Sequence, residues 1–458
     1  MNAIILSALY GVVMMYSGIF LKNNAAIRFT AIIGIVLLIV FNWLEFAGIP
    51  FFNIDTKGML VFNTFGLVFN TVAFVATMFY FLLSGKDMED VGKNVPDYYA
   101  LIFFVLCGVS VVSAFQSLLM LFIGIEIISI PLYILAGSDK RNLKSNEASL
   151  KYFLMGSFST GLMLMGIALL YGATGTFYLE GLNLGAGTLT PIMGIGVVLL
   201  MVSMAFKASA APFHFWTPDV YDGSPAVFTS FMATIVKAAV FVAFFRLFEN
   251  AFGKMHSSWQ MLAAIITAAT LIVGNVTAVF QQSVKRMLAY SSIAQAGFMM
   301  MAIFALNATG KNGLVLYAAA YSLATIGVFA VLIKMKDYTF DGFNGLAKYE
   351  PVLALTTSIL LLSLAGIPLT AGFFSKYYMI LSALKTGEMF WLVIVGVICA
   401  AISIYYYFRV IQSMYFKDAD ETPVVPVSSG FKTILIVAAA LVVLLGVKPG
   451  LLLNLLNL

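Results

Sequence analysis

Uninterrupted apolar runs of about 20 residues recur along this sequence, and that length is what a helix needs to cross a bilayer. About 14 such runs follow one another between residues 2 and 456. The chain is 62% hydrophobic and only 10% charged, whereas soluble domains carry about 25% charged residues. The sequence therefore predicts an all-α membrane protein with about 14 transmembrane helices.

The Lys and Arg residues predict how these spans are oriented. Positively charged loops stay on the cytoplasmic side, and an even number of spans places both termini on the same face. Most basic residues then lie opposite the termini, so we expect both ends on the outer side. The first run, 2–21, has no basic segment before it and is interpreted as a retained span. The net charge of +5 arises from membrane-flanking loops, so lipids are expected partners and nucleic acid is not.

The cysteines and histidines exclude several kinds of redox protein. Cys107 and Cys399 both lie inside apolar runs. They are too few for a disulfide framework, a metal site or an iron–sulfur site. His214 and His256 are the only histidines, which is too few for paired haem ligands. We therefore expect no cofactor in this chain, and any coupled electron transfer to occur in other proteins.

Two of the predicted spans are overlong and interrupted. The stretch 190–221 contains Pro212 and the stretch 351–385 contains Pro368, each within a run of small residues. Proline removes a backbone donor and breaks a helix. Such breaks are tolerated inside a membrane only where protein or a watery cavity satisfies the freed backbone groups. Interrupted spans at corresponding positions indicate internal repeats and a transport site.

The breaks fall in the seventh and twelfth predicted spans, five spans apart. This spacing predicts two five-helix repeats, spans 4–8 and 9–13. Five is an odd number, so consecutive repeats would be inverted relative to each other across the membrane. The predicted organisation is an N-terminal three-helix segment, a first repeat, a second repeat and a C-terminal helix, over residues 1–98, 99–250, 251–416 and 417–458.

Four ionisable residues lie in mid-span, where a charge costs about 2.5 kcal/mol or more and marks a functional site by default. They are Glu126, Lys207, Lys237 and Lys376. A lysine near a helix end also reaches the interface through its long side chain. Lys376, nine residues before Lys385, is the most open to that structural interpretation. A proton path is nevertheless the favoured explanation for all four residues.

The chemistry of such a path requires no redox cofactor. Burial favours the neutral amine of a lysine, and a nearby carboxylate favours its ammonium form. A lysine that gains and loses a carboxylate neighbour therefore takes up and releases a proton. Glu126 and Lys207 are predicted to act in this way, through each other or a water chain. The second repeat differs, because the span 283–307 contains no acid, only Ser291, Ser292 and Gln295 as candidates.

Secondary candidates also have structural interpretations, which are favoured for Lys151 and Asp219. His214, two residues after Pro212, either joins the proton path or fills the broken turn. Glu147 and Lys151 are spaced for an i,i+4 pair, and Lys151 is a candidate for lining an uptake path. Asp219 follows Thr217-Pro218, which is typical of a helix N-cap and first turn; its carboxylate would stabilise the helix dipole or serve proton exit.

Two other motifs are predicted to be structural. Lys285 and Arg286 are interpreted as an anchor at a helix start, with little chemistry. The tyrosines 405–407 are interpreted as packing or an interface belt.

Four segments together resemble one membrane-protein family, subunit N of bacterial respiratory complex I. They are GIEIISIPLYIL, FKASAAPFHFWTPDVYDGSPAVF, VKRMLAYSSIAQAGF and LLSLAGIPLTAGFFSKYYM. The similarity covers roughly residues 99–416. The resemblance implies fourteen helices with two inverted repeats, and a place in the membrane arm of an NADH:quinone oxidoreductase in the bacterial inner membrane.

The resemblance also implies roles and partners. Glu126 would tune Lys207, Lys237 would pass the proton on, and Lys376 would exchange it with the outside. The partners would be the antiporter-like subunits M and L, the lateral helix of subunit L, and the small subunit K. NADH, FMN, iron–sulfur clusters and quinone would belong to the rest of the complex. Many relatives carry histidine where Gln295 stands, and glutamine does not titrate, so water would have to bridge that position.

Other functions are distinguished by specific features. Subunit M usually carries glutamate at the position of Lys376, and subunit L extends beyond the last span. A multisubunit Na⁺/H⁺ antiporter or a membrane-bound hydrogenase-type complex shares the core and is the main alternative. A purely structural subunit does not explain four ionisable residues in mid-span, two of them beside helix breaks. A stand-alone solute transporter would need a substrate cavity and no partners.

Overall fold

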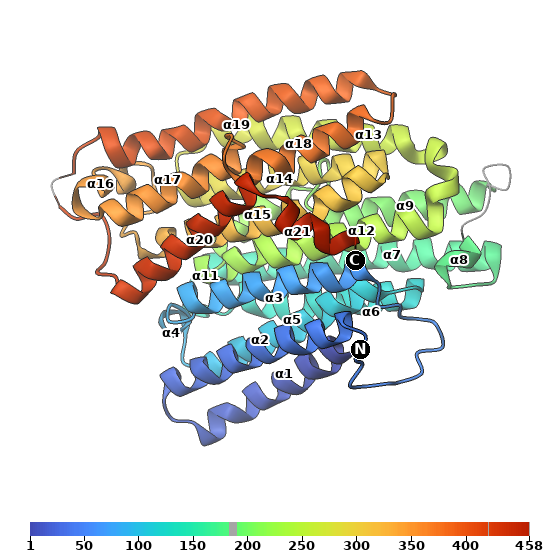
Figure 1. The fold of residues 1–458 in the computed structure, drawn as a ribbon, viewed down its shortest axis with the longest axis horizontal. Helices are drawn as coiled ribbons and strands as arrows, with labels where there is room; N and C mark the ends of the chain where they lie inside the picture. Colours follow the sequence, from blue (N-terminus) through green and yellow to red (C-terminus); the bar gives the residue numbers. More distant parts are fainter. Residues whose placement is uncertain (183–189, 420, 458) are drawn as a thin grey trace.

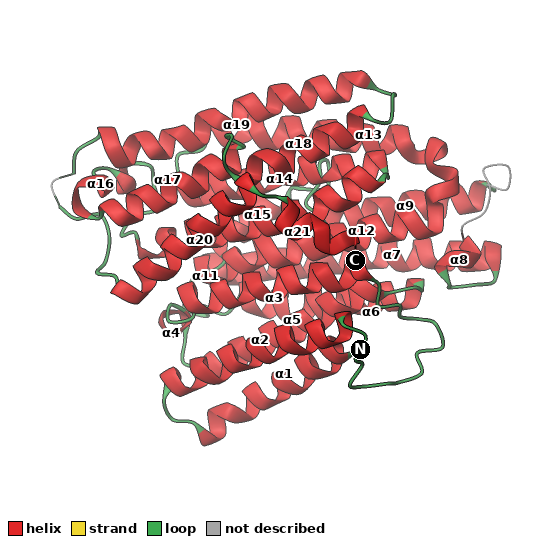
Figure 2. Cartoon of the chain, in the orientation of Figure 1, coloured by secondary structure: helices red, strands yellow, loops and turns green. Residues whose placement is uncertain are grey.

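The computed structural model describes residues 1–182, 190–419 and 421–457, and within these ranges the regular structure is helical, with only isolated β-bridges (Figure 2). The axes of most long helices are roughly aligned, and the helices pack side by side (Figure 1). The all-helical class predicted from the sequence is confirmed. Within the described ranges, eleven helical segments are long and apolar enough to span a membrane, by length and composition.

The N-terminal helices form one edge of the molecule, with α1 and α2 outermost in Figure 1. Much of the outward surface of α1 is apolar and exposed, for example Tyr16, Ile19 and Phe20, which suits contact with lipid tails. Of the other long helices in this part, α3 and α5 are largely buried, whereas α7 has a broad exposed apolar face. Their bounds are α1 Asn2–Phe20, α2 Asn24–Phe46, α3 Thr64–Ser84, α4 Met88–Val91, α5 Val95–Ala114, α6 Leu118–Ala136 and α7 Leu143–Thr174.

The middle of the chain contains one broken helix and one helix with a π-helical turn. Its elements are α8 Leu179–Leu182, α9 Pro191–Lys207, α10 Trp216–Gly223, α11 Ala226–Phe231, the π-turn η2 Met232–Val236, α12 Lys237–Phe252, η3 Gly253–Met255 and α13 His256–Val279. The stretch from α11 to α13 forms one apolar helical segment, Ala226–Val279, long enough to contain two of the predicted spans.

The last part of the chain contains the most buried helices. Nearly every residue of α14 and α15 is buried, and α15 lies in the centre of Figure 1. The elements are α14 Val284–Ala305, α15 Ala308–Lys334, η4 Asp341–Phe343, α16 Leu346–Tyr349, α17 Pro351–Ala365, α18 Ala371–Leu384, α19 Phe390–Phe416, α20 Ser429–Val447, α21 Gly450–Leu453 and η5 Asn454–Asn457. The number of crossings, the inverted repeat and the predicted domain boundaries stay predictions.

Both predicted helix breaks are present. In the first, α9 ends at Lys207 and α10 begins at Trp216. The indole of Trp216 donates to the carbonyl of Phe206 at 3.1 Å, and the backbone N–H of Ala211 donates to Thr270 Oγ1 at 2.9 Å. Side chains thus satisfy backbone groups that the break frees, as a membrane environment requires.

The second break separates α17 from α18. Gly366 has a φ of +86°, which favours glycine, and it follows the last residue of α17. The N–H of Gly372 donates to Ser363 Oγ at 3.1 Å. A Cβ on Gly372 would lie 1.8 Å from the carbonyl oxygen of Ser363. The two half-helices therefore pack backbone against backbone, which only glycine allows at that point.

Two polar contacts tie the N-terminal helices to the rest of the fold. Lys334, at the end of α15, pairs with Asp87 in the loop after α3. Burial raises the pKa of the Asp87 carboxyl, and the ammonium of Lys334 opposes that effect. Arg246 of α12 is 2% exposed, and it donates to Asn63 Oδ1 at 3.1 Å and to the Phe115 carbonyl at 3.0 Å.

Candidate functional site

Glu126 lies on α6, and Lys207 of α9 contacts the same face of that helix, but the two side chains do not form a direct ion pair. Glu126 accepts a hydrogen bond from Thr160 Oγ1 at 2.8 Å. Lys207 Nζ donates to Ser129 Oγ at 3.0 Å and to Tyr133 OH at 3.4 Å. Residues 126, 129 and 133 are three and four apart, so they share one helix face. The ammonium is therefore held within about two turns of the carboxylate, and both side chains are partly exposed.

Lys237 is the first residue of α12, and its side chain is buried against α14. It is 2% exposed. Its Nζ donates to the carbonyl of Ser292 at 3.0 Å and to Ser292 Oγ at 2.9 Å, and it lies 5.6 Å from the centre of the Tyr221 ring. The π-turn Met232–Val236 comes directly before it. Such turns are frequent at functional sites. The sequence placed this lysine in mid-span, but nothing in it predicted the π-turn.

Lys376 is held at the second helix break. Its Nζ donates to the carbonyl of Ala365 at 2.8 Å and to Ser403 Oγ at 3.0 Å. Ala365 is the last residue of α17, where carbonyls lack helical partners. The ring of Phe298 lies 4.8 Å from the ammonium. Lys376 is 5% exposed, so the structural interpretation, in which it extends to the interface, is wrong.

A cluster of buried hydroxyl groups surrounds Gln295, between Lys237 and Lys376. Gln295 Nε2 donates to the Leu364 carbonyl at 3.0 Å and to Tyr407 OH at 3.1 Å. Tyr317 donates to Gln295 Oε1, and Tyr407 is also hydrogen-bonded to Ser291. The interpretation of the tyrosines as packing or interface residues is wrong for Tyr407, because its hydroxyl belongs to a buried network. The sequence signal for this was weak, since residues 295 and 407 are far apart along the chain.

A cavity of ≈ 10 Å³ adjoins Lys376, which is about the room that one water molecule needs. Among the residues that the structure describes, the hydroxyl of Tyr321, one of the lining residues, is buried and meets no hydrogen-bond partner in good geometry. An unsatisfied buried hydroxyl beside a water-sized space indicates a place for water. The lining residues are Gln295, Tyr317, Ala320, Tyr321, Ser363, Leu364, Gly372, Ser375 and Lys376.

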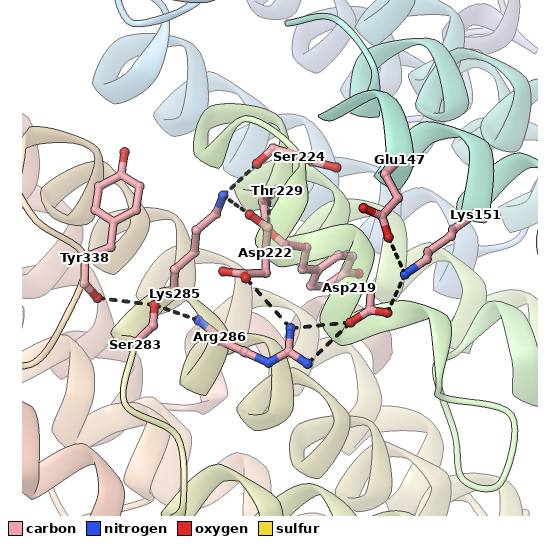
Figure 3. Close-up of polar contacts among 11 residues, drawn as sticks. Glu147, Lys151, Asp219, Asp222, Ser224, Thr229, Ser283, Lys285, Arg286 and Tyr338 are labelled. Atoms are coloured by element: carbon pink, nitrogen blue, oxygen red, sulfur yellow. Dashed lines mark hydrogen bonds and ion pairs between the residues drawn. The ribbon is translucent and has the colours of Figure 1, made fainter. Parts of the chain in front are cut away.

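Lys151 belongs to a surface cluster of ion pairs, which Figure 3 shows. Lys151 Nζ lies 2.7 Å from Glu147 and 2.9 Å from Asp219. Arg286 lies 3.3 Å from Asp219 and 3.7 Å from Asp222. The i,i+4 pair predicted from the sequence is confirmed. Arg286 was predicted to be an anchor with little chemistry, but it joins α14 to α10 through two carboxylates.

The neighbouring lysine and the proposed helix cap also differ from expectation. Lys285 is 6% exposed, and its Nζ donates to the carbonyls of Asp222 and Ser224 at 2.6 and 2.7 Å (Figure 3). Thr217 is not an N-cap, because α10 begins at Trp216 and Thr217 lies in its first turn. A hollow of ≈ 160 Å³ lies over the cluster of Lys151.

His214 lies in the first break, buried, with its ring 4.5 Å from that of Phe215. It makes no hydrogen bond to Glu126, Lys207, Lys237 or Lys376, all of which the structure describes. A role for His214 in the proton path therefore stays a prediction.

The fold and these buried side chains define an antiporter-like membrane subunit. The family described as NADH:quinone oxidoreductase/Mrp antiporter matches residues 116–403. The chain is 40% identical, over 99% of both chains, to NADH-quinone oxidoreductase subunit N of Cytophaga hutchinsonii. A chain of respiratory complex I from Thermus thermophilus is similar in structure, with a TM-score of 0.85 and 32% identity over 99% of this chain and 98% of that one.

A chain of the Mrp complex from Dietzia shares the fold, with a TM-score of 0.81 but only 18% identity over 99% of this chain and 94% of that one. The subunit N relatives are therefore much closer in sequence than the antiporter complex. The chain belongs to the NADH-quinone oxidoreductase subunit N family, and it is a multi-pass membrane protein.

Proposed function

We propose that this chain is the proton-translocating, antiporter-like subunit N of a membrane-arm assembly, and that protons cross it along Glu126, Lys207, Lys237 and Lys376. The observation that carries the proposal concerns the three lysines. Each is bound by hydroxyl or carbonyl oxygens, and within residues 1–182, 190–419 and 421–457 no carboxylate contacts any of their three Nζ atoms. Neutral acceptors stabilise the ammonium form less than a neighbouring carboxylate would, which makes release of the proton easier.

Each lysine has a distinct role in this path. Lys207 lies at the first break, on the α6 face that carries Glu126, so a shift of either side chain changes how strongly the ammonium is held. Lys237 lies between the two halves and passes the proton on. Lys376 lies at the second break and exchanges the proton with the outer side. Lys151 and His214 are secondary members of the path.

We propose the assembly and its location as well, and membership of the subunit N family supports them. The partners are the antiporter-like subunits M and L, the lateral helix of subunit L, and the small subunit K. Electrons pass from NADH to quinone through FMN and iron–sulfur clusters held by other subunits, and this chain holds no cofactor. The protein lies in the bacterial inner membrane, with both termini on the outer side. An Na⁺/H⁺ antiporter role is not favoured, because relatives of that kind share the fold at much lower identity.

The deciding experiment is NADH-driven proton pumping in membrane vesicles that carry Lys207→Ala, with assembly checked on a native gel. We expect quinone reduction and pumping to fall together, by about 100-fold, which is the contribution of a positioned proton-transfer group. Lys417→Ala is the matched control, because Lys417 is an exposed lysine that pairs with Asp341 outside the long helices. Normal pumping in an assembled Lys207→Ala complex would refute the proposed path.

A further inference from the structure

An open apolar groove lies between α17 and α20, two helices that pack side by side (Figure 1). Its volume is ≈ 650 Å³. Ala439 is buried at this groove, whereas Leu355 and Val447 line it with more than half of their surfaces exposed. The hydroxyl of Thr356, another lining residue, donates to the Val352 carbonyl at 2.7 Å and so needs no partner in the groove. The lining therefore offers apolar contacts along its length, which suit a hydrocarbon chain.

One end of the groove carries charge. Lys432 Nζ lies 2.6 Å from Glu350 Oε2, so an ion pair joins the two helices that form the groove. Lys432 lies one turn before the lining residue Ile436 on α20, and Glu350 directly precedes α17. Lys348 and Asp418 form a second, more exposed pair at 4.0 Å, two residues along the chain from Glu350. Two ammonium groups and two carboxylates thus lie near this end.

We propose that this groove binds a zwitterionic phospholipid of the phosphatidylethanolamine type, with one acyl chain between α17 and α20. Its phosphate accepts hydrogen bonds from Lys432, and its ammonium donates to Glu350. An ammonium has three donors and a carboxylate has two oxygens, so each side chain binds the lipid while it keeps its partner in the ion pair. Lys432 also lies in the first turn of α20, and the N-terminus of a helix attracts phosphate groups. The inference goes beyond the proposed function, because lipid binding does not depend on proton movement.

The dimensions of the groove favour a lipid over a helix of another subunit. The lining residues of α20 run from 436 to 447, which is about 17 Å along a helix. The hydrocarbon core of a bilayer is about 30 Å thick, so the groove has roughly the depth of one leaflet. A helix that crosses the membrane would need a groove over the whole thickness.

The charges at the end of the groove favour a zwitterion over an anionic lipid. Pockets with an excess of Lys and Arg bind anionic head groups. Here each ammonium group has a carboxylate beside it, Glu350 at Lys432 and Asp418 at Lys348. An anionic head group would be attracted by the ammonium groups and repelled by the carboxylates. An ethanolamine head group carries a charge of each sign and matches both.

The test is photolabelling of the purified, assembled complex with a phosphatidylethanolamine that carries a diazirine in one acyl chain, followed by peptide mapping by mass spectrometry. We expect adducts on 352–359 and 436–447. Ala440→Phe, on an exposed residue of the lining, fills the groove and should abolish these adducts. Lys432→Gln removes the phosphate contact and should lower the labelling about fivefold, the typical effect of one basic residue at a lipid surface. It serves as the second variant, should Ala440→Phe not assemble.

Ala401→Phe is the matched control, because it makes the same substitution at an exposed alanine of α19 outside the groove lining. Its labelling should equal that of the unaltered complex. Adducts that persist in both groove variants would overturn the site, as would cross-links that join the groove to another subunit instead. Stronger labelling of the same peptides by a phosphatidylglycerol probe would overturn the zwitterionic assignment. Proton pumping is not a readout, so failure of the proposed function would leave the labelling result unchanged.

Discussion

The lysines beside the two helix breaks are held in different ways. Lys207 is partly exposed, bound by two hydroxyls of α6, and shares that helix face with Glu126. Lys376 is buried, bound by a backbone carbonyl and a serine, with no acid in the corresponding span. A carboxylate side chain moves and changes its charge, whereas a carbonyl at a helix end is a fixed dipole. Within the proposed path, this difference would suit the first break to switching a proton and the second break to storing one.

The largest expected effect comes from removing the ammonium group of Lys376. Lys376→Met keeps a long apolar side chain but cannot carry a proton, so we expect quinone reduction and pumping to fall about 100-fold. The measurement is vesicle pumping normalised to assembled complex. Lys385→Met, on an exposed lysine that ends α18, should pump normally. Equal pumping in the two variants would show that Lys376 does not belong to the proton path.

The next effect concerns the close packing of the second break. Gly372→Ala would place a Cβ against the carbonyl oxygen of Ser363, and overpacking of this kind costs about 3 kcal/mol or more. We expect little assembled complex and early thermal inactivation. Gly161→Ala in the first half is the control, because no atom lies within 4 Å of its added Cβ. Two equally stable variants would show that the second break is not rigidly packed.

Glu126→Gln tests the difference between the halves directly, because it makes the first site as free of acid as the second. The amide can still accept a hydrogen bond from Thr160, so assembly should be normal. We expect turnover to fall about tenfold, through loss of the charge that tunes Lys207. Glu147→Gln, on an exposed helix surface, should leave turnover unchanged. Unaltered turnover in Glu126→Gln would mean that the halves work alike.

The smallest effect should come from the surface cluster near the first half. Lys151→Ala removes two exposed ion pairs, each worth about 0.2–1 kcal/mol. We expect turnover to fall about twofold at low salt. At high salt the difference from the unaltered complex should become smaller, because exposed charges are screened. The measurement is turnover at low and high ionic strength. A loss as large as that of Lys376→Met would instead make Lys151 an essential group.

The sequence predicted the features that a linear pattern contains. Glu126 and the three lysines stand out because charge is rare in apolar runs, and Pro212 and Pro368 indicate where the helices break. Contacts between distant segments were not predictable. Gln295 meets Tyr407, and Arg286 meets Asp219, only after helices pack. A tyrosine in an apolar run has the same signature whether it fills space or bonds to a network, so the sequence alone does not reveal the hydrogen bonds of Tyr407.

The π-turn before Lys237 has a consequence for how that lysine is aimed. Its hydrogen bonds close over one more residue than those of an α-helix. The side chains after the turn are therefore shifted by one residue relative to the side chains before it. One residue corresponds to about 100° of rotation about the helix axis. The direction in which Lys237 points from the helix axis, and therefore its contact with Ser292, depends on the wide turn at residues 232–236. Were the wide turn to migrate past position 237, the same lysine would point to a different sector of the protein without any change in its depth.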